Sequence, residues 1–176
     1  MSVPPYPLEH SGPCIVAGNA WTFPEDLQRA QKLFPDASIM AVNGAAREVK
    51  AFALVSQHPQ NFTAAEWVRH QRRLFGGGFT THAPLPHPNV DYWWDVRLAG
   101  GSAWVARKIA SLMGFHPVVL VGCPMMSGNY TNHRPGLLMT KQSVVDELLR
   151  QIETDKEWHD GCYSMSGRTR DILGEC

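Results

Sequence analysis

Six short apolar runs, separated by helix-like and turn-rich stretches, constrain the fold of this chain more than any other feature. Such alternation is typical of βαβ units, in which consecutive strands run parallel. Because 176 residues are enough for one core but too few for two ordinary domains, we expect a single domain over residues 1–176. The prediction is an α/β fold: one Rossmann-like domain, with a mostly parallel sheet and helices on both faces. The predicted strands are Cys14–Ala17, Ser38–Val42, Phe52–Ser56, Phe79–His82, Pro117–Val121 and Gly161–Met165.

Two helices carry start and stop signals in the sequence. In PEDLQRAQKLF, Pro24 suits the first helical turn and Pro35 ends the helix. In TAAEWVRHQRRLFGGG, Thr63 and Glu66 form a capping box and three glycines follow. The apolar positions of this second helix are Trp67, Leu74 and Phe75, and its solvated face is expected to carry Arg69, Arg72 and Arg73.

The segment 83–100, APLPHPNVDYWWDVRLAG, admits two interpretations. It combines three prolines with the aromatic cluster Tyr92-Trp93-Trp94. One interpretation is an edge strand with a hairpin that packs its tryptophans on the core. The other is a loop that borders a ligand cleft, because long loops in compact domains are often functional.

Charge and composition exclude several classes of protein. Sixteen basic residues balance sixteen acidic ones, which leaves no electrostatic footprint for nucleic acid. No run approaches the roughly 18 apolar residues of a membrane span, and MSVPPYPLEH has no features of a signal peptide. We therefore expect a cytoplasmic protein without a nucleic-acid or membrane partner. The four cysteines have no C-x-x-C spacing and are expected to be reduced thiols outside any metal site: Cys14, Cys123, Cys162 and Cys176.

A Gly-Gly-Ser turn opens the most informative local motif, GGSAWVARKIASLMGFHPVVLVGCPMM. Ser102 is placed as an N-cap, Val105, Ile109 and Leu112 share one helical face, and Gly114 ends the helix. Gly100 and Gly101 would let a ligand approach the backbone, and the first helical amides form a generic anion site. The alternative is that Gly-Gly-Ser only makes a tight turn.

Two asparagine turns follow predicted strands. Gly18-Asn19 and Asn43-Gly44 each lie at the carboxyl end of a strand, where open α/β sheets bind ligands. An asparagine amide both donates and accepts hydrogen bonds, which suits ribose, base or phosphate. Either asparagine alone could be a simple turn residue, but together with Gly101-Ser102 they favour a nucleotide site. Ser164, Ser166 and Arg168, after the last predicted strand, could line the same cleft.

Several well-known motifs are absent. The first turn reads GNAWTF, which lacks the G-x-G-x-x-G of dinucleotide-binding proteins, and there is no Walker A sequence. No D-x-D occurs, and Ser102 has no G-x-S-x-G context. The chain therefore carries no fingerprint for a particular cofactor.

The ordered set IVAGNA, IMAVNGA, FALVSQHP and GGSAWVARKIASLMGFHPVVLVGCPMM resembles bacterial family 42 sialyltransferases and the related domain of archaeal 6-hydroxymethylpterin pyrophosphokinases. The resemblance covers about three quarters of the chain in outline. Three departures stand out: the chain is much shorter than the sialyltransferases, Ala20 replaces a glycine of the first turn, and the strand ends G-C-P where the family has G-x-D, so Pro124 replaces an acid. The tail YSMSGRTRDILGE is similar to small proteins of bacteriophages and prophages, which would place the protein in the host cytoplasm.

The resemblance implies roles for particular residues. The nucleotide would be held by Gly18, Asn19, Asn43, Gly44, Gly101 and Ser102. Tyr130 and His133, in the loop after the G-C-P strand, would engage phosphate and act as general base. Apart from the resemblance, His133 reads as an ordinary loop histidine.

The first hypothesis is a metal-independent, glycosyltransferase-like enzyme that uses a nucleotide-activated sugar of the CMP-sugar type, with no cofactor beyond that ligand. The second is a protein that binds a nucleotide without turning it over, which the missing acid and the short chain favour. A diphosphotransferase is a further alternative. It would need Mg²⁺ on carboxylates, for which the candidates are Asp91, Asp95 and Asp160.

Overall fold

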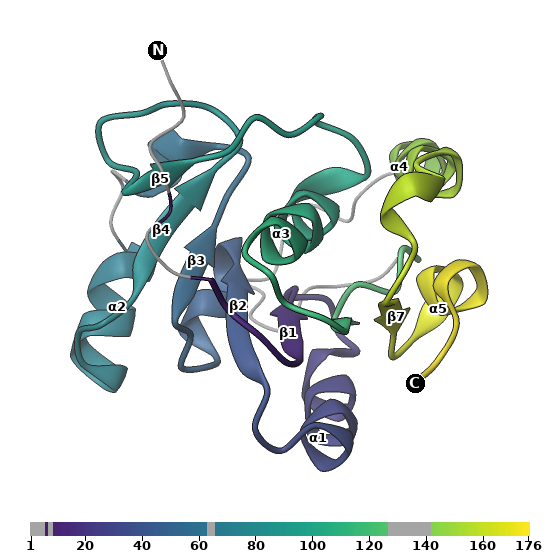
Figure 1. Ribbon diagram of the computed structural model, residues 1–176, viewed down its shortest axis with the longest axis horizontal. Coiled ribbons are helices and arrows are strands. Elements are labelled where there is room, and N and C mark those ends of the chain that lie inside the picture. The colour runs from purple at the N-terminus through teal and green to yellow at the C-terminus, as the bar shows by residue number, and fades with distance from the viewer. Residues whose placement is uncertain (1–5, 7–8, 63–65, 127–141) are drawn as a thin grey trace.

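A single seven-stranded parallel sheet forms the centre of the molecule (Figure 1). The computed structural model describes residues 6, 9–62, 66–126 and 142–176. The strand order is β5-β4-β3-β2-β1-β6-β7, and every neighbouring pair is parallel. The strands are β1 (Cys14–Ala17), β2 (Ser38–Val42), β3 (Ala53–Val55), β4 (Thr80–Ala83), β5 (Tyr92–Trp93), β6 (Val118–Val121) and β7 (Cys162–Ser164).

Helices cover both faces of this sheet. Figure 1 shows α1 and α2 on one side of the sheet and α3 on the other, with α4 and α5 near β7. The helices are α1 (Phe23–Leu33), α2 (Glu66–Phe75), α3 (Gly101–Leu112), α4 (Gln142–Thr154) and α5 (Gly167–Leu173). The 3-10 helices are η1 (Asn43–Arg47), η2 (Pro59–Phe62) and η3 (Lys156–Trp158). This is the predicted α/β, Rossmann-like architecture.

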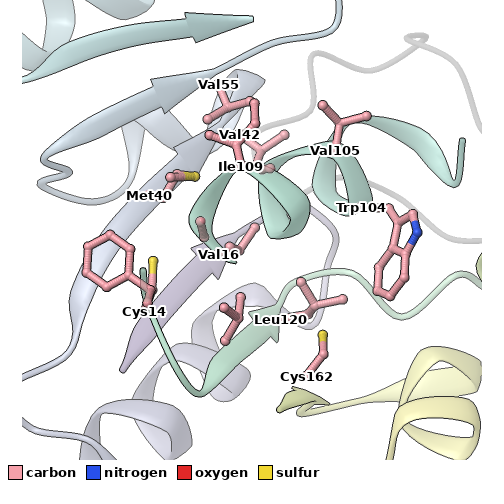
Figure 2. Close-up of a cluster of buried hydrophobic side chains, with 14 of the residues drawn as sticks. Cys14, Val16, Met40, Val42, Val55, Trp104, Val105, Ile109, Leu120 and Cys162 are labelled. Carbon is pink, nitrogen blue, oxygen red and sulfur yellow. The ribbon is translucent and has the colours of Figure 1, made fainter. Parts of the chain in front are cut away.

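The central strand explains why the apolar runs are continuous. Cys14 and Val16 of β1 pack in the cluster that contains α3, whereas Ile15 and Ala17 pack in the cluster that contains α1. All four side chains are fully buried. A strand covered on both faces needs apolar residues at every position. Figure 2 shows the first of these clusters, in which Val105 and Ile109 of α3 lie among the side chains of β2 and β3.

Every predicted strand is present in the structure, with bounds that agree to within one residue. The bounds of β1 and β2 are those predicted, and the other four predicted strands differ by a residue at one or both ends. Pro24 lies in the first turn of α1, Phe34 caps its end before Pro35, and Gly114 follows α3 with φ +98°. The capping residue Thr63 lies outside the described residues.

Three sequence predictions are wrong in detail. The N-cap of α3 is Gly100, in a left-handed conformation, so Ser102 lies inside the first turn and caps nothing. Leu112 and Leu74 are 50% and 54% exposed, so these two apolar positions do not pack on the core. The segment 83–100 contains an edge strand, as one interpretation held, but β5 pairs with β4 in parallel and forms no hairpin. The helices α4 and α5 were not anticipated.

Among the described helices, none combines the length and apolar character needed to cross a bilayer.

Candidate functional site

The strand order reverses direction at β1, next to β6. From β1 the chain builds β2 to β5 outward on one side, and then returns through α3 to place β6 on the other side of β1. Because all strands are parallel, the carboxyl ends of β1, β2 and β6 lie at one edge. Open α/β sheets bind ligands at this kind of switch point.

Two glycines bring the ends of β1 and β6 into direct contact. A Cβ on Gly18 would lie 2.6 Å from the carbonyl oxygen of Gly122, and a Cβ on Gly122 would lie 2.6 Å from that of Gly18. Gly122 also has φ +61°, which disfavours any side chain. Gly18 N donates to Val121 O at 2.8 Å, and Ala20 N donates to Gly122 O at 3.1 Å. Backbone packing therefore accounts for Gly18, with or without a ligand.

Asn19, Asn43 and Gly44 come together beside this contact. A Cβ on Gly44 would lie 2.8 Å from Asn19 Nδ2, so the amide of Asn19 lies directly over Gly44. Asn43 has φ +51°, in the left-handed region that asparagine tolerates better than most residues. Its Oδ1 is buried and accepts no hydrogen bond from any residue that the structure describes. The sequence placed these residues at one edge, and the structure brings them within contact distance.

The Gly-Gly-Ser turn lies at the same edge. The other end of α3 reaches the amino edge, where Met113 O accepts from His10 N at 2.8 Å just before β1. A twelve-residue helix is about 18 Å long, enough to span the sheet, so Gly101 and Ser102 lie at the carboxyl edge. Gly100 and Gly101 have φ +70° and +79°.

Side chains from other parts of the chain contact this turn. Gly100 N donates to Gln151 Oε1 at 2.8 Å, so one amide of the predicted anion site is already used. Side-chain atoms of Leu148 and Met125 lie 3.6 and 4.0 Å from the Cβ position of Gly101. Substitution by alanine there would also be strained by the positive φ.

The sequence did not reveal a buried carboxylate at this edge. Asp26, in the first turn of α1, is 2% exposed. Its Oδ2 accepts from Gly122 N at 2.9 Å and from Ser166 Oγ at 2.5 Å. Ser166 Oγ also lies 3.1 Å from Thr22 Oγ1. Asp26 thus provides an acid at the β6 turn, beside Gly122. The sequence signals were its place in a first helical turn and its spacing from Phe23 and Ala30, which puts it on the face that α1 buries.

Cys123, Tyr92 and Trp94 have structural roles. Burial raises the pKa of the Cys123 thiol to about 12, so this group beside Gly18 is a protonated thiol at neutral pH. Tyr92 stacks on His82 with ring centroids 5.5 Å apart, and Trp94 Nε1 donates to His82 Nδ1 at 3.1 Å. The aromatic segment therefore packs on the core.

Two residues are predicted to act in catalysis. Tyr130 and His133 fall outside the described residues. Among the described residues, no group of three or more His, Cys, Asp or Glu side chains could hold a metal ion. Of the magnesium candidates, Asp91 accepts from Thr81 Oγ1 at 2.8 Å, and the carbonyl of Asp160 accepts from Arg107 at 2.7 Å.

Comparison with known proteins found no matching family model, no matching curated protein and no matching solved structure.

Proposed function

We propose that the carboxyl edge of the sheet binds a nucleotide at the switch point between β1 and β6. The observation that carries this proposal is Asn43, which combines a left-handed backbone with a buried acceptor that has no described partner. It lies next to Gly44 and the amide of Asn19, at the place where this class of sheet takes its ligands.

The energetics of Asn43 support a ligand with a hydrogen-bond donor. An acceptor left unsatisfied in the interior costs about 1–3 kcal/mol. A left-handed backbone adds about 1–2 kcal/mol for an ordinary residue and less for asparagine. A ribose hydroxyl or a base amino group would satisfy the Oδ1 atom and offset this cost. Phosphate, which only accepts, would instead need the Nδ2 atoms or the backbone amides of the α3 turn.

The enzymatic form of the proposal is a metal-independent, glycosyltransferase-like enzyme that acts on a CMP-sugar type of donor. Its support is the ordered resemblance to sialyltransferases, carried by the same turns. In this reaction an acceptor hydroxyl attacks the sugar, His133 takes the hydroxyl proton, and the nucleotide leaves with the bonding electrons. Tyr130 would contact the phosphate.

The second candidate is a protein that binds the nucleotide without turnover. The arrangement of Asp26 favours it, because that carboxylate is occupied by Gly122 N and Ser166 Oγ. A diphosphotransferase has less support, since no group of three or more His, Cys, Asp or Glu side chains among the described residues could hold a metal ion, and the carboxylate of Asp91 already accepts from Thr81 Oγ1.

Substitution of Asn43 tests the site. A mononucleotide at about 100 times its Kd should stabilise the wild-type fold by about 2.7 kcal/mol. Asn43→Gly keeps the left-handed backbone without strain and removes the amide, so this gain should largely disappear. Asn43→Asp should retain binding if Oδ1 accepts from a ribose hydroxyl, and should weaken it if the amide faces phosphate. Thermal unfolding with CMP, UMP, ADP-ribose and GTP measures these effects.

A matched control is Asn89→Gly, the same change on an exposed loop away from this edge. It should leave the ligand-induced shift unchanged. If no nucleotide in the panel raises the melting temperature of the wild-type protein, the proposed site is wrong.

Turnover separates the two candidates. In the enzyme, His133→Ala should lower kcat by about 10²–10⁴-fold and change nucleotide affinity little, because a general base acts mainly in the transition state. The measurement is nucleotide release from CMP-sugars, with His87→Ala as the control. Nucleotide binding without release from any donor would instead identify the protein as a binder.

A further inference from the structure

A hollow of about 630 Å³ lies along α2 and the end of η1, and its lining includes none of the residues of the carboxyl-edge turns. It is lined by Arg47, Glu66, Arg69, His70, Arg72 and Arg73. Four of the six side chains are arginines and Glu66 is the single acid. The chain as a whole has equal numbers of basic and acidic residues, so this concentration of positive charge is local.

The arginines of α2 are held on a fixed framework. Gln71, which is 1% exposed, donates to Ala46 O at 2.6 Å and Val49 O at 2.5 Å and accepts from Ala51 N at 3.3 Å. These bonds fasten α2 to η1 and the segment after it. His70 Nε2 lies 2.9 Å from Arg47 O. The backbone that carries these arginines is therefore fixed before any ligand arrives.

The helix α2 carries opposite and like charges at neighbouring positions, and Glu66 lies three residues before Arg69, an arrangement that stabilises a helix. Arg69 has like charges at i+3 and i+4, in Arg72 and Arg73, and such pairs destabilise a helix. The helix dipole favours cations in the last turn, which accounts for Arg72 and Arg73 but not for Arg69. Arg47 pairs with Glu66, while the side chains of Arg72 and Arg73 are exposed. An anion in the hollow would relieve this repulsion.

We propose that this hollow binds a small molecule that carries two or more phosphate groups. Guanidinium groups bind phosphate through paired hydrogen bonds, which lysine cannot reproduce. The volume falls within the range of about 300–1,000 Å³ typical of small-molecule sites. Because the arginines on α2 are exposed, binding should weaken as salt concentration rises.

Pyrophosphate is the probe for the test, with the full chain in isothermal titration calorimetry at low salt. We expect saturable binding by the wild-type protein. Arg72→Gln with Arg73→Gln should weaken it by about tenfold per arginine, the effect of one lost charge-assisted hydrogen bond. Glu66→Gln should strengthen it, because the change removes the acid and frees Arg47.

The control Lys32→Gln with Arg150→Gln removes the same charge from exposed positions on α1 and α4 and should leave affinity within about twofold. Asn43→Gly should also leave pyrophosphate binding unchanged, which separates this site from the proposed nucleotide site. Absence of saturable binding, an equal loss in the Lys32 and Arg150 control, or preference for a single-stranded oligonucleotide over pyrophosphate would each overturn the proposal.

Discussion

Acidification from pH 7 to pH 4 is expected to lower the free energy of unfolding by about 3 kcal/mol through one side chain, His82. Burial lowers the pKa of His82 to about 3, from an ordinary value of 6.5. The residue is fully buried in β4. Its imidazole is neutral in the folded protein, with Nδ1 accepting from Trp94 Nε1 at 3.1 Å and Nε2 2.7 Å from Thr80 Oγ1.

The direction follows from proton binding in the two states. Below pH 6.5 the unfolded chain protonates this histidine, whereas the folded protein does not until about pH 3. The stabilisation is therefore complete above pH 6.5 and is lost between these values, at up to about 1.4 kcal/mol per pH unit. The neighbouring groups are Asp91, which raises the pKa, and His10, which lowers it.

Urea unfolding at a series of pH values measures this effect. His82→Gln should be less stable than wild type at pH 7, because it loses the contacts with Trp94 and Thr80. The difference between the two proteins should shrink as the pH falls toward 4. His58→Gln, at an exposed position, should follow the wild-type pH profile. Parallel profiles for wild type and His82→Gln would contradict the assignment.

Asp155→Ala is expected to destabilise the protein by about 3–5 kcal/mol, because it leaves a lysine buried without a counter-charge. Lys108 of α3 is 0% exposed and forms an ion pair with Asp155. Asp155 Oδ2 also accepts from Trp104 Nε1 at 2.8 Å, and Lys108 Nζ donates to Arg97 O at 3.3 Å. Burial acts to raise the pKa of Asp155, but the hydrogen bonds from Lys108 and Trp104 bring it below its ordinary value.

A double variant distinguishes the ion pair from simple packing. Lys108→Met with Asp155→Asn removes both charges, keeps the side-chain volumes similar and retains an acceptor for Trp104. It should be clearly more stable than Asp155→Ala in urea unfolding. Lys156→Ala, at the exposed neighbouring position, should change stability by less than about 0.5 kcal/mol. Equal losses in the single and double variants would show that the charge pair is not the cause.

Local sequence was sufficient to predict the bounds of elements that do not depend on contacts with particular distant residues. The runs Cys14–Ala17 and Ser38–Val42 have the bounds of β1 and β2, because strands in the middle of a parallel sheet are covered on both faces. Pro24 and Pro35 bounded α1 because proline acts through its own backbone. The turns at Asn19 and Asn43 could be placed at one edge for a similar reason, since parallel strands share their carboxyl ends.

Contacts between distant segments decided the rest. The sequence GSAWVARKIASLMG places Arg107 and Lys108 in the middle of α3, where an amphipathic pattern would leave charges in solvent. Both are buried, because the chain after α4 brings Asp155 and Trp158 over that face of α3. The ring centroid of Trp158 lies 5.5 Å from Arg107 Cζ and 5.8 Å from Lys108 Nζ.

At the candidate site, the burial of Asp26 also depends on a distant part of the chain. Its position in a first helical turn predicts a solvated acid, although it lies on the same helical face as Phe23 and Ala30, which α1 buries. It is buried because the β6 turn, 96 residues away in sequence, presents Gly122 N to its carboxylate. The sequence by itself determined which segments become strands and which edge carries the polar turns. Only the tertiary structure decided which charged groups could leave water, because burying a charge requires partners that distant parts of the chain supply.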